Sequence, residues 1–160
     1  MYLFFLISIL IIALDQLSKW WIVNHMELYQ SISVISDFFY ITSHRNRGAA
    51  FGILQNQTWL FIVVTSCVVI AIIVFMMKMK KETVLTKTAL SFVLGGAIGN
   101  FLDRVRTGEV VDFFHFQFGA YHFPIFNVAD SAICVGVVLF LLANLLDAKK
   151  EQYKSSVGDA

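Results

Sequence analysis

Two aspartates, Asp112 and Asp130, lie at or just inside the border of an apolar segment. Asp112 belongs to Gly-Glu-Val-Val-Asp-Phe (108–113) and Asp130 to Phe-Pro-Ile-Phe-Asn-Val-Ala-Asp-Ser (123–131). An ionisable side chain at membrane depth costs about 2.5–3.5 kcal/mol on insertion scales, so it usually marks a working site. Two close carboxylates cannot both ionise cheaply, so one keeps a proton. Such a pair predicts peptide hydrolysis, in which the charged carboxylate takes a proton from water and the protonated one binds the peptide carbonyl.

Amide and guanidinium side chains accompany the aspartates at the same depth. Asn100 and Arg104 are four residues apart, and Asn127 and Asp130 are three apart. On a helix, each of these pairs shares a face. We expect the last helix to begin at Pro124, which suits a first helical turn. Asp130 would then lie roughly 9 Å from the outer end of that helix.

Asp15, in the first apolar segment, is a third carboxylate at comparable depth. Lys19 follows four residues later, and we interpret it as a helix-surface ion pair with Asp15 or as a lysine that extends to the interface. A single aspartate could equally be a structural residue bonded between helices, but three at one depth favour a site. For Arg104, the alternative is a side chain that extends to the interface and pairs with Asp103.

The rest of the chain is suited to lipid. Of its 160 residues, 58% are hydrophobic and 14% are charged, with a mean hydropathy of +0.74, whereas a soluble domain has about 25% charged residues. The net charge of +1 and the lack of any basic stripe argue against nucleic acid as a partner. We predict a single-domain (1–160), all-α integral membrane protein. Its four segments long enough to cross the hydrocarbon core are 2–23, 58–77, 84–101 and 124–146.

The connections between these helices predict the orientation. Lysines are concentrated in the connection 78–83 and the tail 147–160, whereas the connections 24–57 and 102–123 carry only arginines as basic residues. The excess of basic residues on the cytoplasmic side then places both termini in the cytoplasm. The two aspartates would face the outer side.

The first outward connection is too long for a simple turn. Its segment 31–42 is rich in β-branched and aromatic residues, and we expect one or two strands there, resting at the membrane surface. Gly48 and Gly52 would form a turn before the second helix. Gly95 and Gly99 form a Gly-x-x-x-Gly pattern, which predicts close packing between helices.

Other chemistries find little support. The four histidines are scattered and form no His-Glu-x-x-His pattern, so we expect no metal site. No Gly-x-Ser-x-Gly elbow surrounds a serine. A proton-coupled transporter or relay subunit is an alternative use of the same aspartates, although the inner halves of the helices carry almost no ionisable residues. A purely structural membrane protein is disfavoured because Asp, Asn and Arg gather on one side.

Five ordered blocks of this sequence closely resemble the motifs of bacterial lipoprotein signal peptidases, the signal peptidase II family. The resemblance extends along nearly the whole chain. The blocks are Asp-Gln-Leu-Ser-Lys (15–19), His-Arg-Asn-Arg-Gly-Ala-Ala-Phe-Gly (44–52), Gly-Gly-Ala-Ile-Gly-Asn-Phe-Leu-Asp-Arg (95–104), Gly-Glu-Val-Val-Asp-Phe (108–113) and Phe-Asn-Val-Ala-Asp-Ser (126–131).

The resemblance implies an aspartyl endopeptidase of the bacterial cytoplasmic membrane, with Asp112 and Asp130 as the catalytic dyad. Its substrates would be prolipoproteins with a diacylglyceryl group on the cysteine that follows the cleavage site. Globomycin would inhibit it, and we expect a monomer that needs no cofactor. The residues implied to line and order the site are Asp15, Asn46, Asn100, Arg104 and Asn127.

Overall fold

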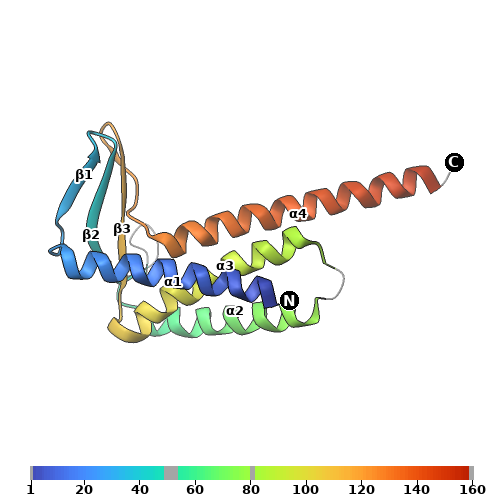
Figure 1. Cartoon of the computed structure of the whole chain (residues 1–160), viewed down its shortest axis with the longest axis horizontal. Helices are drawn as coiled ribbons and strands as arrows, with labels where there is room; N and C mark the ends of the chain where they lie inside the picture. Colours follow the sequence, from blue (N-terminus) through green and yellow to red (C-terminus); the bar gives the residue numbers. More distant parts are fainter. Residues whose placement is uncertain (1, 49–53, 80–81, 159–160) are drawn as a thin grey trace.

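Four long helices form a bundle with a small sheet at one end (Figure 1). The structure, a computed structural model, describes residues 2–48, 54–79 and 82–158. Gly52, which was expected in a turn, and Lys80 and Lys81, which contributed to the predicted orientation, lie outside these ranges. The helices are α1 (Tyr2–His25), α2 (Thr58–Lys78), α3 (Val84–Thr107) and α4 (Val128–Gly158).

All four helices are long and apolar enough to cross a membrane, which confirms the prediction of four spanning helices. Their outer surfaces are covered with exposed apolar side chains such as Leu10, Val63 and Leu141. In water this exposure would be unfavourable, but lipid tails are as apolar as these side chains. At its C-terminal end, α4 extends beyond the other helices (Figure 1).

Helix α3 lies at the centre of the bundle and packs against α1, α2 and α4. Its glycines allow this close approach. A Cβ atom at Gly95 would lie 2.8 Å from Cβ of Ile11, and one at Gly99 would lie 2.6 Å from Oδ2 of Asp15. Gly96 faces the backbone of Ala129 in α4 in the same way. The prediction of close packing at Gly95 and Gly99 is confirmed.

Several helix boundaries differ from the sequence-based expectation, most of all the C-terminal end of α4, which lies at Gly158 and not at 146, so most of the predicted tail 147–160 is helical. Helix α3 continues past the predicted end at 101 to Thr107, and Gly108 closes it with φ 81°, a left-handed conformation that glycine adopts without strain. Helix α4 begins at Val128, not at Pro124. The segment before it stays extended because Phe126 exchanges backbone hydrogen bonds with Phe114.

The sheet is antiparallel with the order β1-β2-β3-β4. Its strands are β1 (Ser31–Ile35), β2 (Phe39–Asn46), β3 (Val110–Phe118) and β4 (Tyr121–His122). One or two strands were expected in 31–42, and two are present, although β2 extends to Asn46. The all-α description was incomplete, because β3 and β4 come from the connection 102–123, which was expected to be a loop. Aromatic residues dominate β3 and favour the strand.

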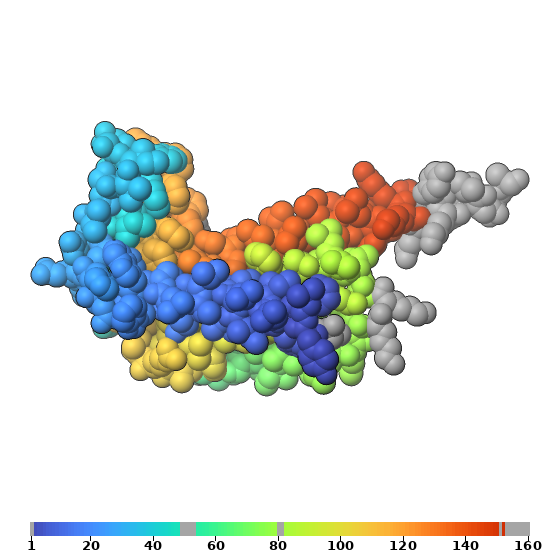
Figure 2. All heavy atoms as spheres, in the orientation of Figure 1, coloured from blue at the N-terminus to red at the C-terminus, as the bar shows by residue number. Residues whose placement is uncertain are grey.

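An apolar cluster joins the sheet to the helices. Ile22 and Met26, from the end of α1 and the residue after it, pack against Val111 and Phe113 of β3. All four side chains are buried. Side chains alternate along a strand, so Asp112, which lies between Val111 and Phe113, points to the opposite face of β3. Figure 2 shows the sheet projecting from the end of the bundle where α4 begins.

Candidate active site

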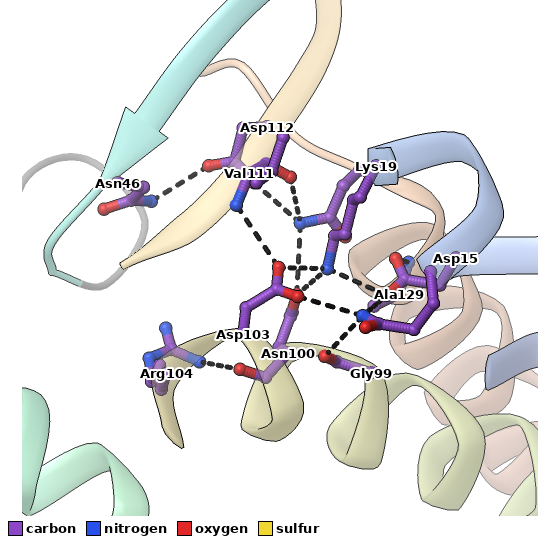
Figure 3. Close-up of polar contacts among 12 residues, drawn as sticks. Asp15, Lys19, Asn46, Gly99, Asn100, Asp103, Arg104, Val111, Asp112 and Ala129 are labelled. Atoms are coloured by element: carbon purple, nitrogen blue, oxygen red, sulfur yellow. Dashed lines mark hydrogen bonds and ion pairs between the residues drawn. The ribbon is translucent and has the colours of Figure 1, made fainter. Parts of the chain in front are cut away.

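Asp112 is held by β3 at the end of the helix bundle. Its backbone lies opposite that of His44 in β2, and the residue is only 2% exposed. Its Oδ1 accepts a hydrogen bond from Nδ2 of Asn127 at 2.6 Å. Its Oδ2 accepts one from Nδ2 of Asn46 at 3.1 Å (Figure 3). Both carboxylate oxygens are therefore fixed in place by amide donors.

The surroundings of Asp112 favour its protonated form. Burial raises the pKa of Asp112 from 3.8 to about 7, and the nearby charge of Asp130 adds to the rise. The hydrogen bonds from Asn46 and Asn127 and the charge of Lys19 act in the opposite direction without cancelling it. Near neutral pH, a large fraction of Asp112 therefore carries a proton.

Asp130 lies in the first turn of α4. Its backbone N–H donates to Oδ1 of Asn127 at 2.9 Å, and its Oδ2 accepts from the backbone N–H of Asn127 at 3.2 Å. This reciprocal pattern is a helix cap, in which two residues satisfy each other's backbone donors. Asn100 donates to Oδ1 of Asp130 at 2.7 Å. The partial positive charge at a helix N-terminus also favours a carboxylate here.

The sequence predicted that Asn127 and Asp130 share a helix face, with Asp130 six residues into the helix. In the structure, Asn127 is the N-cap of α4 and Asp130 is in its first turn, so Asp130 lies at the N-terminal end of the helix. Asn127 is completely buried. Its Nδ2 lies within hydrogen-bonding distance of Asn100, Val111 and Asp112. The side chain therefore orders the two carboxylates and has no free group for a substrate.

A cavity of about 520 Å³ opens beside the two aspartates. Both carboxylate residues line it, at the junction of α3, the sheet and the start of α4. The polar part of the wall consists of Asn46, Asn100, Arg104, Asp112, Asp130 and Ser131. The apolar part includes Val110, Phe123, Pro124, Ile125, Phe126, Ile133 and Cys134.

Arg104 supplies the positive charge of the cavity wall. Its guanidinium donates to the carbonyl oxygen of Gly48 at 3.3 Å and to that of Asn100 at 3.5 Å. It also lies 4.8 Å from the ring centroid of Phe61, at a distance where a cation and an aromatic face attract each other. The charge of Arg104 acts on Asp130 and Asp112 through space.

A second polar cluster lies behind the cavity and contains Lys19. This lysine is 2% exposed and forms ion pairs with Oδ2 of Asp15 at 2.8 Å and with Oδ2 of Asp103 at 2.9 Å. It also donates to Oδ1 of Asn100 at 2.9 Å. Asp15 Oδ1 accepts from the backbone N–H of Ala129 at 2.9 Å, so the cluster joins α1, α3 and α4 (Figure 3).

The structure brings the seven predicted site residues together in two layers. Asp112, Asp130, Asn46, Asn100 and Arg104 line the cavity, and Asn127 connects the two aspartates from beneath. Asp15 does not line the cavity but supports the start of α4 through Ala129.

The sequence interpretation missed the roles of Lys19 and Asp103. Lys19 is buried, not on the helix surface, and Asp103 pairs with Lys19 and not with Arg104. A signal was present in the sequence, because the buried residues of α1 follow helical spacing. They are Ser8, Ile11, Asp15, Lys19 and Ile22. A charged residue on the protein-facing side of a spanning helix is expected to have a partner.

Ionisable groups are confined to the sheet end of the buried interior. Among the described residues, the buried ionisable side chains are Asp15, Lys19, Asp103 and Asp112. Toward the other end of the helices, the buried polar residues are Ser8, Thr86 and Ser91. This distribution disfavours a proton pathway across the membrane. Within 2–48, 54–79 and 82–158, no group of three or more His, Cys, Asp or Glu residues is placed to hold a metal ion.

Comparisons with known proteins identify the family of the chain. The family model described as signal peptidase (SPase) II matches residues 7–146. The lipoprotein signal peptidase of Bacillus pumilus (strain SAFR-032) is 55% identical over 147 residues, covering 92% of this chain and 95% of that protein. The lipoprotein signal peptidase of Halalkalibacterium halodurans is 51% identical over 148 residues, with coverages of 92% and 95%.

Two solved structures of bacterial membrane enzymes share the fold of the chain. A bacterial membrane enzyme solved by the in meso method at 2.3 Å resolution aligns with a TM-score of 0.87 and 41% identity over 94% of this chain and 92% of its own. A second, at 1.9 Å resolution, gives a TM-score of 0.82 and 41% identity over 91% and 94%. With four spanning helices and a family model that matches most of its length, the chain belongs to the signal peptidase II family of multi-pass membrane proteases.

Proposed function

We propose that this protein is an aspartyl endopeptidase that removes the signal peptide from diacylglyceryl-modified prolipoproteins, with Asp112 and Asp130 as its catalytic residues. The observation that carries the proposal is the arrangement of these two carboxylates. They line one cavity, share Asn127 as a hydrogen-bonding partner, and have different surroundings. Family membership supports the substrate class, because relatives more than half identical to this chain are lipoprotein signal peptidases.

The different surroundings suggest a division of roles. Asp130 lies at a helix N-terminus and accepts hydrogen bonds from Asn100 and from the backbone of Asn127, so it is placed as a hydrogen-bond acceptor. Asp112 is buried in the sheet, and burial together with the charge of Asp130 raises its pKa to about 7. Asp130 would therefore be the general base and Asp112 the proton donor.

Hydrolysis would proceed in two balanced steps. Asp130 takes a proton from water as the hydroxide oxygen bonds to the peptide carbon, and Asp112 gives its proton to the carbonyl oxygen. In the second step, Asp112 takes back a proton from one hydroxyl of the tetrahedral intermediate. The C–N bond then breaks, and Asp130 gives its proton to the departing amine. Both carboxylates end in their starting states, with no covalent intermediate.

The cavity wall fits a substrate that carries acyl chains. Apolar side chains such as Phe123, Ile125 and Ile133 line the same cavity as the two carboxylates, and Ile133 belongs to the apolar part of α4. A lipid attached next to the scissile bond could remain in an apolar environment while the bond reaches the aspartates. Cleavage immediately before the lipidated cysteine is consistent with this placement.

We further propose that the protein lies in the bacterial cytoplasmic membrane with both termini in the cytoplasm and the sheet on the outer side. The distribution of lysines and arginines supports this orientation. The active site would then lie near the outer headgroup level. We expect a monomer without a cofactor and inhibition by globomycin.

A cleavage assay tests the proposed function. Purified wild-type protein, Asp112→Asn and Asp130→Asn would be incubated with a diacylglyceryl-modified prolipoprotein and with the same protein lacking the lipid. We expect the wild type alone to cleave, only the lipidated substrate, and equally well with a chelator or without. Thermal unfolding of each variant in detergent checks that it is folded. A folded wild type that leaves the lipidated substrate intact would overturn the proposal.

A further inference from the structure

Lys19 is buried beneath the cavity, where all three of its N–H donors have partners. The partners are Oδ2 of Asp15, Oδ2 of Asp103 and Oδ1 of Asn100, at distances of 2.8–2.9 Å. A lysine ammonium has three donors and no acceptor. Its hydrogen-bonding capacity is therefore filled by two carboxylates and one amide oxygen, which come from α1 and α3.

The contact with Asn100 fixes the orientation of an amide that touches Asp130. Asn100 Oδ1 accepts from Nζ of Lys19 at 2.9 Å and from Nδ2 of Asn127 at 3.1 Å, while its Nδ2 donates to Oδ1 of Asp130 at 2.7 Å. If the amide turned over, its NH₂ group would face the donors of Lys19 and Asn127, and its oxygen would face the carboxylate of Asp130. Donors would then oppose donors and an acceptor would oppose an acceptor.

We infer that Lys19 is a positioning residue of the proposed cleavage reaction, which holds the Asn100 amide so that its NH₂ group points at Asp130. This inference rests on the proposed function. Lys19 does not line the cavity, so it acts through Asn100 and does not contact the substrate. Asn127 supports the same orientation of the Asn100 amide from the other side, but its NH₂ group also donates to Asp112. The ammonium of Lys19 has no acceptor to present, so it can only donate to Asn100.

The charges around Lys19 determine how the inference is tested. Asp15 and Asp103 contact the ammonium directly, and Lys19 acts on Asp112 through space. Removing Lys19 alone would leave two buried carboxylates without their cation, so a loss of folding could hide its effect on Asn100. The combination Lys19→Met with Asp103→Asn restores the net charge of the cluster and leaves Asp15 with its bond to Ala129.

The experiment is a double-mutant cycle in the Asp103→Asn protein. Lys19→Met is introduced with and without Asn100→Ala, and kcat and KM are measured with the lipidated prolipoprotein. When Asn100 is present, we expect Lys19→Met to lower kcat roughly 10- to 100-fold, with little change in KM. In the presence of Asn100→Ala, the same substitution should lower kcat less than about threefold, because the amide that Lys19 orients is gone.

A purely structural lysine would behave differently. Lys19→Met would then lower kcat by the same factor with or without Asn100→Ala, and the midpoint of thermal unfolding would fall equally in both. That outcome would overturn the inference and leave the proposed function intact, since the proposed function is tested separately by cleavage with the wild type. Failure of the wild type to cleave would instead count against the proposed function itself. Lys19→Arg, which keeps a donor toward Asn100, should retain more activity than Lys19→Met if the protein remains folded.

Discussion

Asn127 and Asp130 cap each other across the first turn of α4. The side-chain oxygen of Asn127 accepts the backbone N–H of Asp130 at 2.9 Å, and the Asp130 carboxylate accepts the backbone N–H of Asn127 at 3.2 Å. The remaining NH₂ group of Asn127 lies 2.6 Å from Asp112. The residue that begins the helix therefore also sets the relative position of the two aspartates, so helix formation and site assembly depend on one side chain.

Substitutions of Asn127 should separate these two roles. Asn127→Ala removes the cap and the donor to Asp112, so we expect lower stability, by about 1 kcal/mol for the cap alone, and a loss of activity of roughly 100-fold or more. Asn127→Ser keeps an oxygen that can accept the Asp130 N–H but lacks the NH₂ group. It should recover most of the stability and little of the activity, as measured by thermal unfolding and cleavage rate. Equal recovery of stability and activity would contradict the role of the Asn127 NH₂ group in positioning Asp112.

The pH dependence of cleavage should reflect the proton on Asp112. Its pKa is raised to about 7 by burial and by the charge of Asp130, and the proposed mechanism requires the protonated form. We therefore expect kcat/KM to fall about tenfold per pH unit above neutrality. The pH profile reports the aspartate pair and not one residue alone. A kcat/KM that stays flat from pH 4 to 9, with chemistry rate-limiting, would contradict the shared-proton mechanism.

Asn46→Ala is a matched variant for the pH profile of kcat/KM. Its hydrogen bond to Oδ2 of Asp112 favours the ionised carboxylate and so lowers the pKa of Asp112. In Asn46→Ala the pKa of Asp112 should rise further, because this donor is lost. The fall of kcat/KM at alkaline pH should therefore begin at a higher pH than in the wild type. A general loss of activity would lower kcat/KM at every pH without this shift.

Stability should also depend on the ionisation of Asp112. The folded protein holds this proton with a pKa of about 7, compared with 3.8 for an ordinary aspartate. The corresponding stabilisation is complete below the unfolded pKa and is lost as the pH rises through the folded pKa. Between pH 5 and pH 8, the midpoint of thermal unfolding of the wild type should therefore fall more than that of Asp112→Asn, by several degrees. Asp37→Asn, which changes an exposed aspartate, should follow the wild type.

Hydropathy alone predicted the four helices, the rarity of charge in them identified Asp15 and Asp130, and Asp112 was identified at the border of an apolar segment. These features are local, so one chain suffices to detect them. Strand β3 escaped prediction because its nine residues become a strand only by pairing with β2, more than sixty residues earlier in the sequence. The segment was therefore assigned to a loop, although its aromatic residues favour a strand.

The start of α4 and the environment of Lys19 were missed for a related reason. Pro124 is a favourable first helical residue, but the pairing of Phe126 with Phe114 keeps that segment extended and moves the cap to Asn127. The four-residue spacing of Asp15 and Lys19 is the same for an exposed ion pair and a buried one. Only the packing of α1 on α3, which brings Asp103 to Lys19, distinguishes the two.

Gly99 makes the final prediction, because its missing side chain leaves room for Asp15. A Cβ atom at Gly99 would lie 2.6 Å from Oδ2 and 3.0 Å from Cγ of Asp15. Gly99→Ala must therefore displace the carboxylate that holds Lys19 and the backbone N–H of Ala129. We expect a lower midpoint of thermal unfolding and slower cleavage.

A compensating variant shows whether this contact is the cause. Asp15→Ala removes the atoms that a Cβ at Gly99 would meet most closely, so adding Gly99→Ala to Asp15→Ala should cost little further stability, although Cβ of Ala129 remains at 3.3 Å. The two substitutions should thus be strongly non-additive, as expected for residues in direct contact. If Gly99→Ala lowered the unfolding midpoint equally in both proteins, the glycine would be needed for the packing of α3 in general and not for the placement of Asp15.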